Sequence, residues 1–151
     1  YRKSAEENRV PAKLFYALIL NESRSKVNKH GIRPWPWTIN HRKQSHYFPS
    51  RELAYRYALA QINSGDNNLD IGMGQASWKW HSKRFPDLWS AFDPYTNLSF
   101  SAKYLREQFD KPECHSWVLA VGCYHRSRQG DSDKRIAQNY ANKVIAIWKK
   151  I

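Results

Sequence analysis

Two of the thirteen carboxylates in this chain belong to apolar patterns, where an acidic group is suited to acid–base chemistry: Glu22 ends an apolar helical stripe, and Asp70 lies between Leu69 and Ile71. Glu22 follows Phe15, Leu18 and Ile19 at helical spacing (i, i+3, i+4, i+7), which is one face of an α-helix. Because an apolar stripe faces the core, we expect Glu22 where the last helical turn meets the core or a cleft. Desolvation there would raise the pKa of its carboxyl group and make it a general acid. A helix-end glutamate turned toward water is the alternative interpretation.

Asp70 lies just before a short segment that contains two glycines, Gly72 and Gly74. Glycines let the backbone approach a partner closely, and the amide of Gln75, which follows, can both donate and accept hydrogen bonds. We expect Asp70 to cap or brace this turn rather than to take part in catalysis. Both roles stay open from the sequence.

Other catalytic signatures do not occur in the sequence. The six histidines are scattered, and neither an H-E-x-x-H pattern nor a Cys-His quartet is present. The sequence also has no nucleophile elbow and no phosphate-binding glycine loop. We therefore expect neither a metal ion nor a cofactor.

The charge balance is strongly basic, with 25 Lys and Arg against 13 Asp and Glu, a formal net charge of +12. This balance predicts attraction to a polyanion such as nucleic acid, an anionic membrane surface or an acidic wall polymer. The basic residues never exceed two in a row, and no nucleic-acid-binding motif is present, so nucleic acid is not the expected partner. No run is long enough for a membrane span. Because the chain starts at Tyr1 without Met, we expect a processed or truncated N-terminus that has lost its signal segment.

The two cysteines, Cys114 and Cys123, leave two possibilities open. Within one helix, nine residues at ~1.5 Å rise would separate them by about 13 Å, too far for a disulfide. A bridge therefore requires a helix that begins after Cys114 and a chain that folds back beside it. Export favours pairing, whereas the short spacing opposes it.

At 151 residues the chain is long enough for one domain with its own core, and we expect a polar lead-in over residues 1–10 and a catalytic domain over 11–151. The alternation over 35–40, with 46–48 as its partner, predicts a small β-hairpin near residues 35–48. Around it we expect about six helices, which makes the fold mainly α. The first helix runs from Pro11 to Ser23, and the second runs from the N-cap Ser50 to a stop at Gly65, with Leu53, Ala54, Tyr57 and Ala58 on its apolar face. The third passes through Trp78 and Trp80 to Phe85, and the fourth has the stripe Leu98, Ala102, Leu105 and Phe109. The fifth covers Trp117–Tyr124, and the sixth has the stripe Ile136, Tyr140, Val144 and Ile147.

Four motifs, in order, resemble those of the soluble lytic transglycosylase family. They are Asn21-Glu22-Ser23, similar to its glutamate-serine motif; Gly72-Met73-Gly74-Gln75, similar to its Gly-Leu-Met-Gln motif; Asp93-Pro94 with Asn97-Leu98 and Tyr104-Leu105; and Ala120-Val121-Gly122-Cys123-Tyr124-His125. The order and the separations agree from about residue 10 to the end. The segments 36–40 and 140–148 look most like the branch that serves conjugation, type IV secretion or pilus machines.

The resemblance implies an α+β, lysozyme-like fold and a reaction that uses a single glutamate. Glu22 would protonate the oxygen that links N-acetylmuramic acid to N-acetylglucosamine in peptidoglycan. As a carboxylate it would then help the muramoyl 6-hydroxyl attack C1, which gives a 1,6-anhydro product without water. The resemblance also implies an exported monomer in the periplasm or cell envelope, with peptidoglycan strands and a secretion, conjugation or pilus machine as partners.

Five further residues bind substrate if the family pattern carries over. Ser23 would orient the sugar or Glu22, Gln75 would bind sugar, Tyr124 would hydrogen-bond near the carboxyl group, and Asn40 and Met73 would add contacts. Two positions depart from the pattern, because Gly74 replaces a methionine and His125 replaces an asparagine.

Two other interpretations remain. A goose-type muramidase would hydrolyse the same bond with water, and Asp70 could then serve as the second carboxylate that hydrolysis needs. Alternatively, the chain is a basic module that binds DNA or glycan without turnover.

Overall fold

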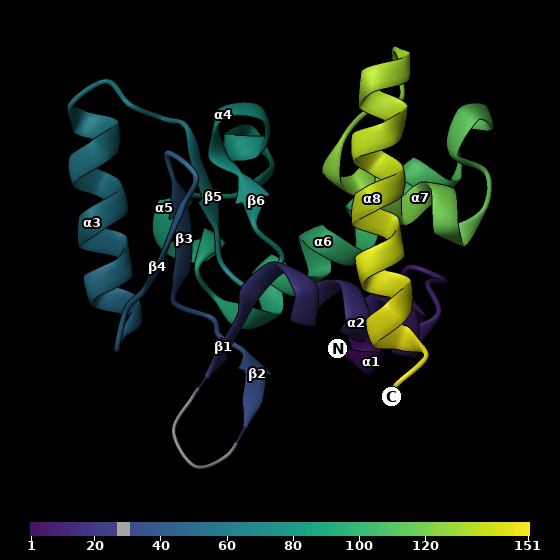
Figure 1. Cartoon of the computed structure of the whole chain (residues 1–151). Helices are drawn as coiled ribbons and strands as arrows, with labels where there is room; N and C mark the ends of the chain where they lie inside the picture. The colour runs from purple at the N-terminus through teal and green to yellow at the C-terminus, as the bar shows by residue number, and fades with distance from the viewer. Residues whose placement is uncertain (27–30) are drawn as a thin grey trace. The chain divides into compact units, whose positions relative to one another are not determined.

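The computed structural model describes residues 1–26 and 31–151, and the chain divides into two compact units (Figure 1). One unit comprises Tyr1–Asn21 and Ser101–Ile151, and the other comprises Glu22–Phe100. Helices account for 60% of the structure and strands for 12%, which confirms the mainly α fold with a small β-hairpin. In the described ranges, no helix combines the length and the apolar character needed to cross a bilayer.

The first unit is helical. It contains α1 (Arg2–Glu7), most of α2 (Ala12–Ser23), the later part of α6 (Pro94–Phe109), the 3-10 helix η3 (Pro112–Cys114), α7 (Trp117–His125) and α8 (Asp131–Trp148). Helices α7 and α8 pack closely at Gly122, where an added Cβ would lie 2.7 Å from the carbonyl oxygen of Ala137. The predicted helices at 11–23, 98–109, 117–124 and 136–147 are confirmed, and the second of them begins earlier, at Pro94.

The expected polar lead-in over residues 1–10 contains helix α1 and buries Ser4, Ala5 and Val10. The segment is mostly polar, so its composition does not indicate that these few residues are enough to pack a short helix. The side chain of Asn8 then closes the segment by donating to the carbonyl of Ser4 at 2.8 Å.

The two cysteines form a disulfide, with their Cα atoms 6.4 Å apart. Cys114 ends η3, and α7 begins only at Trp117, so the chain turns back before the helix that carries Cys123. The helix thus begins after Cys114 and the chain folds back beside it, as a bridge between two cysteines at this spacing requires.

The second unit is built on a four-stranded antiparallel sheet with the order β4-β3-β5-β6. The strands are β3 (Thr38–His41), β4 (Gln44–Tyr47), β5 (Leu69–Ile71) and β6 (Ala76–Ser77). A separate pair, β1 (Arg24–Lys26) and β2 (Ile32–Pro34), follows the end of α2. The predicted hairpin is β3 and β4, whereas sequence patterns missed β1, β2, β5 and β6, which are only two or three residues long.

The helices of this unit are α3 (Arg51–Asn63), α4 (Trp78–His81), η2 (Ser82–Arg84), α5 (Leu88–Ala91) and the first part of α6. The predicted N-cap of α3 is confirmed, because the Ser50 side chain accepts from the Leu53 N–H, and Gly65 follows the helix with φ +91°. One residue of its predicted apolar face is wrong. Leu53 is 45% exposed, and Ala54 and Ala58 make the buried contact.

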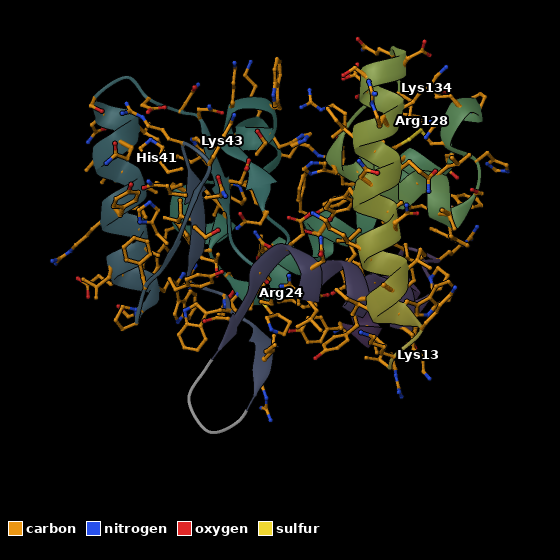
Figure 2. All side chains as sticks on the ribbon, viewed as in Figure 1. Lys13, Arg24, His41, Lys43, Arg128 and Lys134 are labelled. Carbon is orange, nitrogen blue, oxygen red and sulfur yellow. A yellow bond between two sulfur atoms is a disulfide. The ribbon has the colours of Figure 1, made fainter. Side chains whose placement is uncertain are left out.

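Basic side chains are spread over both units, as the sequence predicts (Figure 2). Lys13, Arg128 and Lys134 belong to the first unit, and Arg24 and Lys43 belong to the second.

Candidate functional site

Glu22 occupies the position that the helical pattern predicts. Phe15, Leu18 and Ile19 are fully buried along α2, and Glu22 is half-buried in the last turn of the same helix. Ser23, the last residue of the helix, is fully buried. The carboxyl group thus stands where a core-facing stripe reaches the surface, and its role as general acid stays a prediction.

A chain of hydrogen bonds ties the end of α2, at Ser23, to the glycine turn, which begins at Gly72. The backbone N–H of Trp35 donates to the Ser23 carbonyl at 2.9 Å, and the Thr38 hydroxyl donates to the Trp35 carbonyl at 2.7 Å. The Gly72 N–H donates in turn to the Thr38 carbonyl at 2.9 Å, and the Gln75 N–H donates to the Gly72 carbonyl at 3.1 Å. Two motifs that the sequence singled out separately therefore belong to one continuous framework.

The glycine turn adopts a backbone that only glycine fits well at its first position. Gly72 has φ +76°, and a Cβ there would lie 2.5 Å from Nδ2 of Asn97. Asn97 is buried, donates to the carbonyls of Ile71 (2.9 Å) and Ala91 (3.1 Å), and accepts from the Gly74 N–H (2.8 Å). Sequence reasoning gave Asn97 no role of its own. The signal that could have identified it is a polar residue on the buried side of a helix.

Gln75 uses its side chain partly to stabilise this turn. Its Nε2 donates to the Gly72 carbonyl at 2.9 Å and more weakly to the Thr38 carbonyl at 3.5 Å, and its own φ is +51°. Nε2 is thus engaged by one short hydrogen bond within the protein, and the binding of sugar by Gln75 stays a prediction.

One face of the sheet carries a row of polar residues with a carboxylate at its centre. Asp70 on β5 is paired in register with Asn40 on β3 and with Ser77 on β6, and directly paired residues project to the same face. Ile39 and Ile71 project to the opposite face and are fully buried. Burial raises the pKa of Asp70 from 3.8 to about 6. This carboxyl group can therefore hold or release a proton in a mildly acidic to neutral medium.

The remaining predicted site residues differ in accessibility and in the unit that holds them. Ser23 and Met73 are buried, so they can position neighbours but present little surface to a sugar. Asn40 and Gln75 are half-buried and share the second unit with Glu22. Tyr124 belongs to the first unit, where its ring meets that of Tyr104 edge-on at 5.3 Å.

His125, the second departure from the family pattern, stacks flat on Tyr140 of α8 with ring centroids 4.4 Å apart. Desolvation of the ring, followed by the charges of Arg126 and Lys143, lowers the pKa of His125. The neutral imidazole is therefore favoured, as suits a ring that stacks on an aromatic neighbour.

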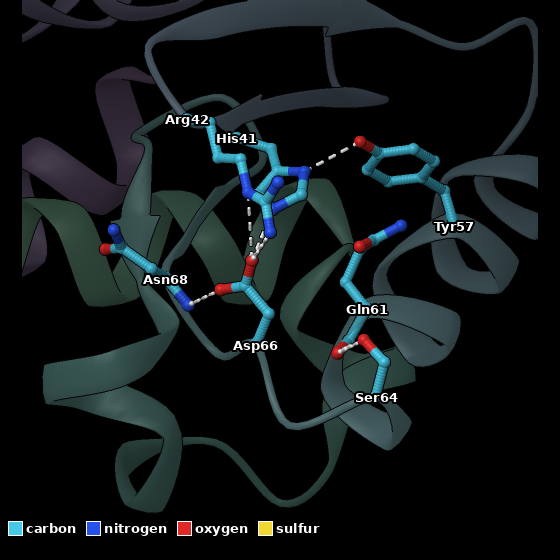
Figure 3. Close-up of polar contacts among 7 residues, drawn as sticks. All are labelled: His41, Arg42, Tyr57, Gln61, Ser64, Asp66 and Asn68. Atoms are coloured by element: carbon cyan, nitrogen blue, oxygen red, sulfur yellow. Dashed lines mark hydrogen bonds and ion pairs between the residues drawn. The ribbon is translucent and has the colours of Figure 1, made fainter.

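A polar network that sequence reasoning missed holds the β3–β4 hairpin to α3 and to the loop after it (Figure 3). His41 is buried, with Nδ1 2.8 Å from the Tyr57 hydroxyl and Nε2 2.8 Å from the Asp66 carboxylate. Arg42 and the Asn68 N–H also donate to Asp66, at 3.3 Å and 3.1 Å. These hydrogen bonds, that of His41 first, lower the pKa of Asp66, so the carboxylate stays ionised.

No family model, curated protein or solved structure matches this chain. The chemistry of the residues described above therefore has to carry the functional proposal. Over residues 1–26 and 31–151, no three His, Cys, Asp or Glu side chains gather into a set that could hold a metal ion.

Proposed function

We propose that this protein is a lytic transglycosylase that cleaves the bond between N-acetylmuramic acid and N-acetylglucosamine in peptidoglycan. One observation carries the proposal. Glu22 ends the buried stripe of α2, and hydrogen bonds join the end of that helix through Trp35 and Thr38 to the Gly72–Gln75 turn. A general acid has to be held rigidly against a substrate-binding element, and this framework can do so.

The proposed reaction uses Glu22 twice. Its carboxyl group donates a proton to the bridging oxygen as the bond from that oxygen to C1 breaks. The resulting carboxylate then accepts the proton of the muramoyl 6-hydroxyl as O6 bonds to C1, so Glu22 ends in its starting form. Buried Ser23 would position Glu22, while half-buried Asn40 and Gln75 would contact sugar.

Asp70 favours a second candidate, a muramidase that hydrolyses the same bond. Hydrolysis with inversion needs a second carboxylate to activate water. Burial raises the pKa of the Asp70 carboxyl group to about 6, and this group lies among polar side chains on the sheet face. The two candidates share Glu22 and differ in whether Asp70 takes part.

We also propose export to the periplasm or cell envelope, where the protein would open the wall locally for a secretion, conjugation or pilus machine. The Cys114–Cys123 disulfide supports this proposal, because such bonds persist in oxidising compartments. The net charge of +12 suits an anionic wall as partner.

The test is mass spectrometry of the products that wild type, Glu22→Gln and Asp70→Asn release from purified peptidoglycan, in water enriched in heavy oxygen. Anhydro-muropeptides without heavy oxygen from wild type and Asp70→Asn, but not from Glu22→Gln, would support the transglycosylase. Reducing ends that carry heavy oxygen and disappear in Asp70→Asn would favour the muramidase. Glu52→Gln, which changes a glutamate on exposed α3 surface, is the matched control and should behave as wild type. Equal activity of Glu22→Gln and wild type would contradict both candidates.

A further inference from the structure

Two chain segments rich in basic residues leave the four-stranded sheet at the same end. Strands β3 and β6 both pair antiparallel with β5, so they run in the same direction. Strand β3 leads into the turn Arg42–Lys43, and β6 leads directly into α4, which carries Lys79 and Trp80. Figure 1 shows the hairpin turn and α4 at this common end. We call Arg42, Lys43, Lys79 and Trp80 the basic end of the sheet.

The hairpin turn carries two cations in a backbone conformation that does not favour them. His41 pairs with Gln44, so Arg42 and Lys43 form a two-residue turn, and their φ angles are +51° and +64°. Turns of this kind strongly prefer Asn-Gly, because glycine has no Cβ and asparagine tolerates the left-handed region better than most other residues. Arg42 is 76% exposed and is oriented by Asp66, and Lys43 projects at the turn (Figure 2). The turn therefore carries two positively charged residues in place of a sequence with less backbone strain.

Helix α4 adds an exposed aromatic ring. Trp80 is 74% exposed, the most of the large apolar side chains described, and the ammonium of Lys79 lies 5.1 Å from its ring. An aromatic face beside a cation can stack on a planar amide or a sugar ring while the cation meets an anion. The segment 78–84 contains Lys79, Lys83 and Arg84 and no acidic residue.

We propose that the basic end of the sheet binds the acidic peptide stems that branch from peptidoglycan sugars. This inference rests on the proposed function. Asn40 lies two and three residues before Arg42 and Lys43, so a glycan seated on the polar face of Asn40, Asp70 and Ser77 would direct a stem toward this end. Stem peptides carry free carboxylates, which complement the three cations, and planar amides, which suit Trp80.

The experiment compares three soluble probes by titration calorimetry at low salt: an isolated stem peptide with free carboxylates, the same peptide with its carboxylates amidated, and a peptide-free glycan fragment. The key variant is Arg42→Asn/Lys43→Gly, which removes both charges and installs the favoured turn sequence, so it should fold at least as well as wild type. Lys149→Gln/Lys150→Gln removes the same charge from two exposed residues just after α8 and is the matched control.

We expect wild type and the control to bind the free-carboxylate peptide about fivefold more tightly than Arg42→Asn/Lys43→Gly does, and amidation to remove that difference. Trp80→Ala should weaken binding of both peptides. Equal binding by wild type and Arg42→Asn/Lys43→Gly, or an effect of the same size in the control, would overturn the inference. The inference would also be overturned if the protein bound a DNA duplex tightly through Arg42 and Lys43 and did not bind the peptide. The peptide-free glycan tests the proposed function alone, since failure to bind or cleave it would count against that function whatever the peptides do.

Discussion

Asn97 fills the space beside Gly72 where a side chain would otherwise lie. A Cβ on Gly72 would approach Nδ2 of Asn97 to 2.5 Å, and that same Nδ2 donates to the carbonyl of Ile71, the residue before the glycine. Asn97 also accepts from the N–H of Gly74. The Asn97 side chain therefore hydrogen-bonds backbone groups on both sides of Gly72 and holds the turn that carries Gln75.

Substitution of Gly72→Ala should destabilise the protein for two reasons. The residue has φ +76°, where alanine is strained, and its Cβ would displace the buried Asn97 amide. Together we expect a loss of about 3 kcal/mol in the free energy of unfolding, measured by urea denaturation.

The matched control is Gly65→Ala. Gly65 has φ +91°, but nothing lies within 4 Å of an added Cβ. Only the backbone cost, roughly 1 kcal/mol, should appear there. Equal losses at the two glycines would mean that the contact with Asn97 adds nothing.

The helical framework could be predicted because its signals are local. The stripe Phe15, Leu18, Ile19 and Glu22 repeats over a single helix, and Ser50 caps the helix that it precedes. Strand β5 escaped prediction because its three residues, Leu69–Ile71, are too few for an alternating pattern, and pairing with β3 stabilises it instead.

The partners of His41 and Asn97 could not be predicted for a different reason. His41 meets Tyr57 and Asp66 at separations of 16 and 25 residues, and Asn97 meets Gly74 across 23 residues. No period in the sequence encodes such contacts, since they form only when the elements pack. The contacts of these two polar residues nevertheless organise the β3–β4 hairpin and the glycine turn.

The hydrogen bond between Tyr57 and His41 gives a second test of the fold. The Asp66 carboxylate can only accept, so in the neutral imidazole Nε2 carries the hydrogen and Nδ1 accepts from the Tyr57 hydroxyl. Tyr57→Phe leaves Nδ1 of a buried ring without that donor. We expect a loss of about 1 kcal/mol in the free energy of unfolding by urea denaturation.

Tyr55→Phe on the same helix is the control for this change. Tyr55 contacts Trp89 through its ring, edge-on at 5.4 Å, and the substitution keeps the ring. Its unfolding free energy should stay within about 0.5 kcal/mol of wild type. A loss at Tyr55 as large as that at Tyr57 would contradict a specific role for the Tyr57 hydroxyl.

Asp70 predicts how the stability of the protein depends on pH. Burial raises the pKa of Asp70 from 3.8 to about 6, so between these values the folded state binds a proton that the unfolded state has released. Stability must therefore fall as pH rises through this window, and above it the buried charge costs about 3 kcal/mol in full. Well below the unfolded-state pKa of 3.8 the carboxyl group is protonated in both states and the cost vanishes.

Asp70→Asn removes the titration while it keeps the size of the side chain. Relative to wild type, the variant should be more stable by about 3 kcal/mol at pH 8 and nearly equal at pH 4, by urea denaturation at both values. The comparison cancels the other carboxylates, including Asp66 and Asp87, whose lowered pKa values act in the opposite direction. Glu113→Gln, at an exposed position, should show no such difference between the two pH values. An Asp70→Asn variant that is less stable than wild type at pH 8 would mean that the ionised carboxylate stabilises the fold, and Asp70 would then be a brace for the glycine turn and not a proton carrier.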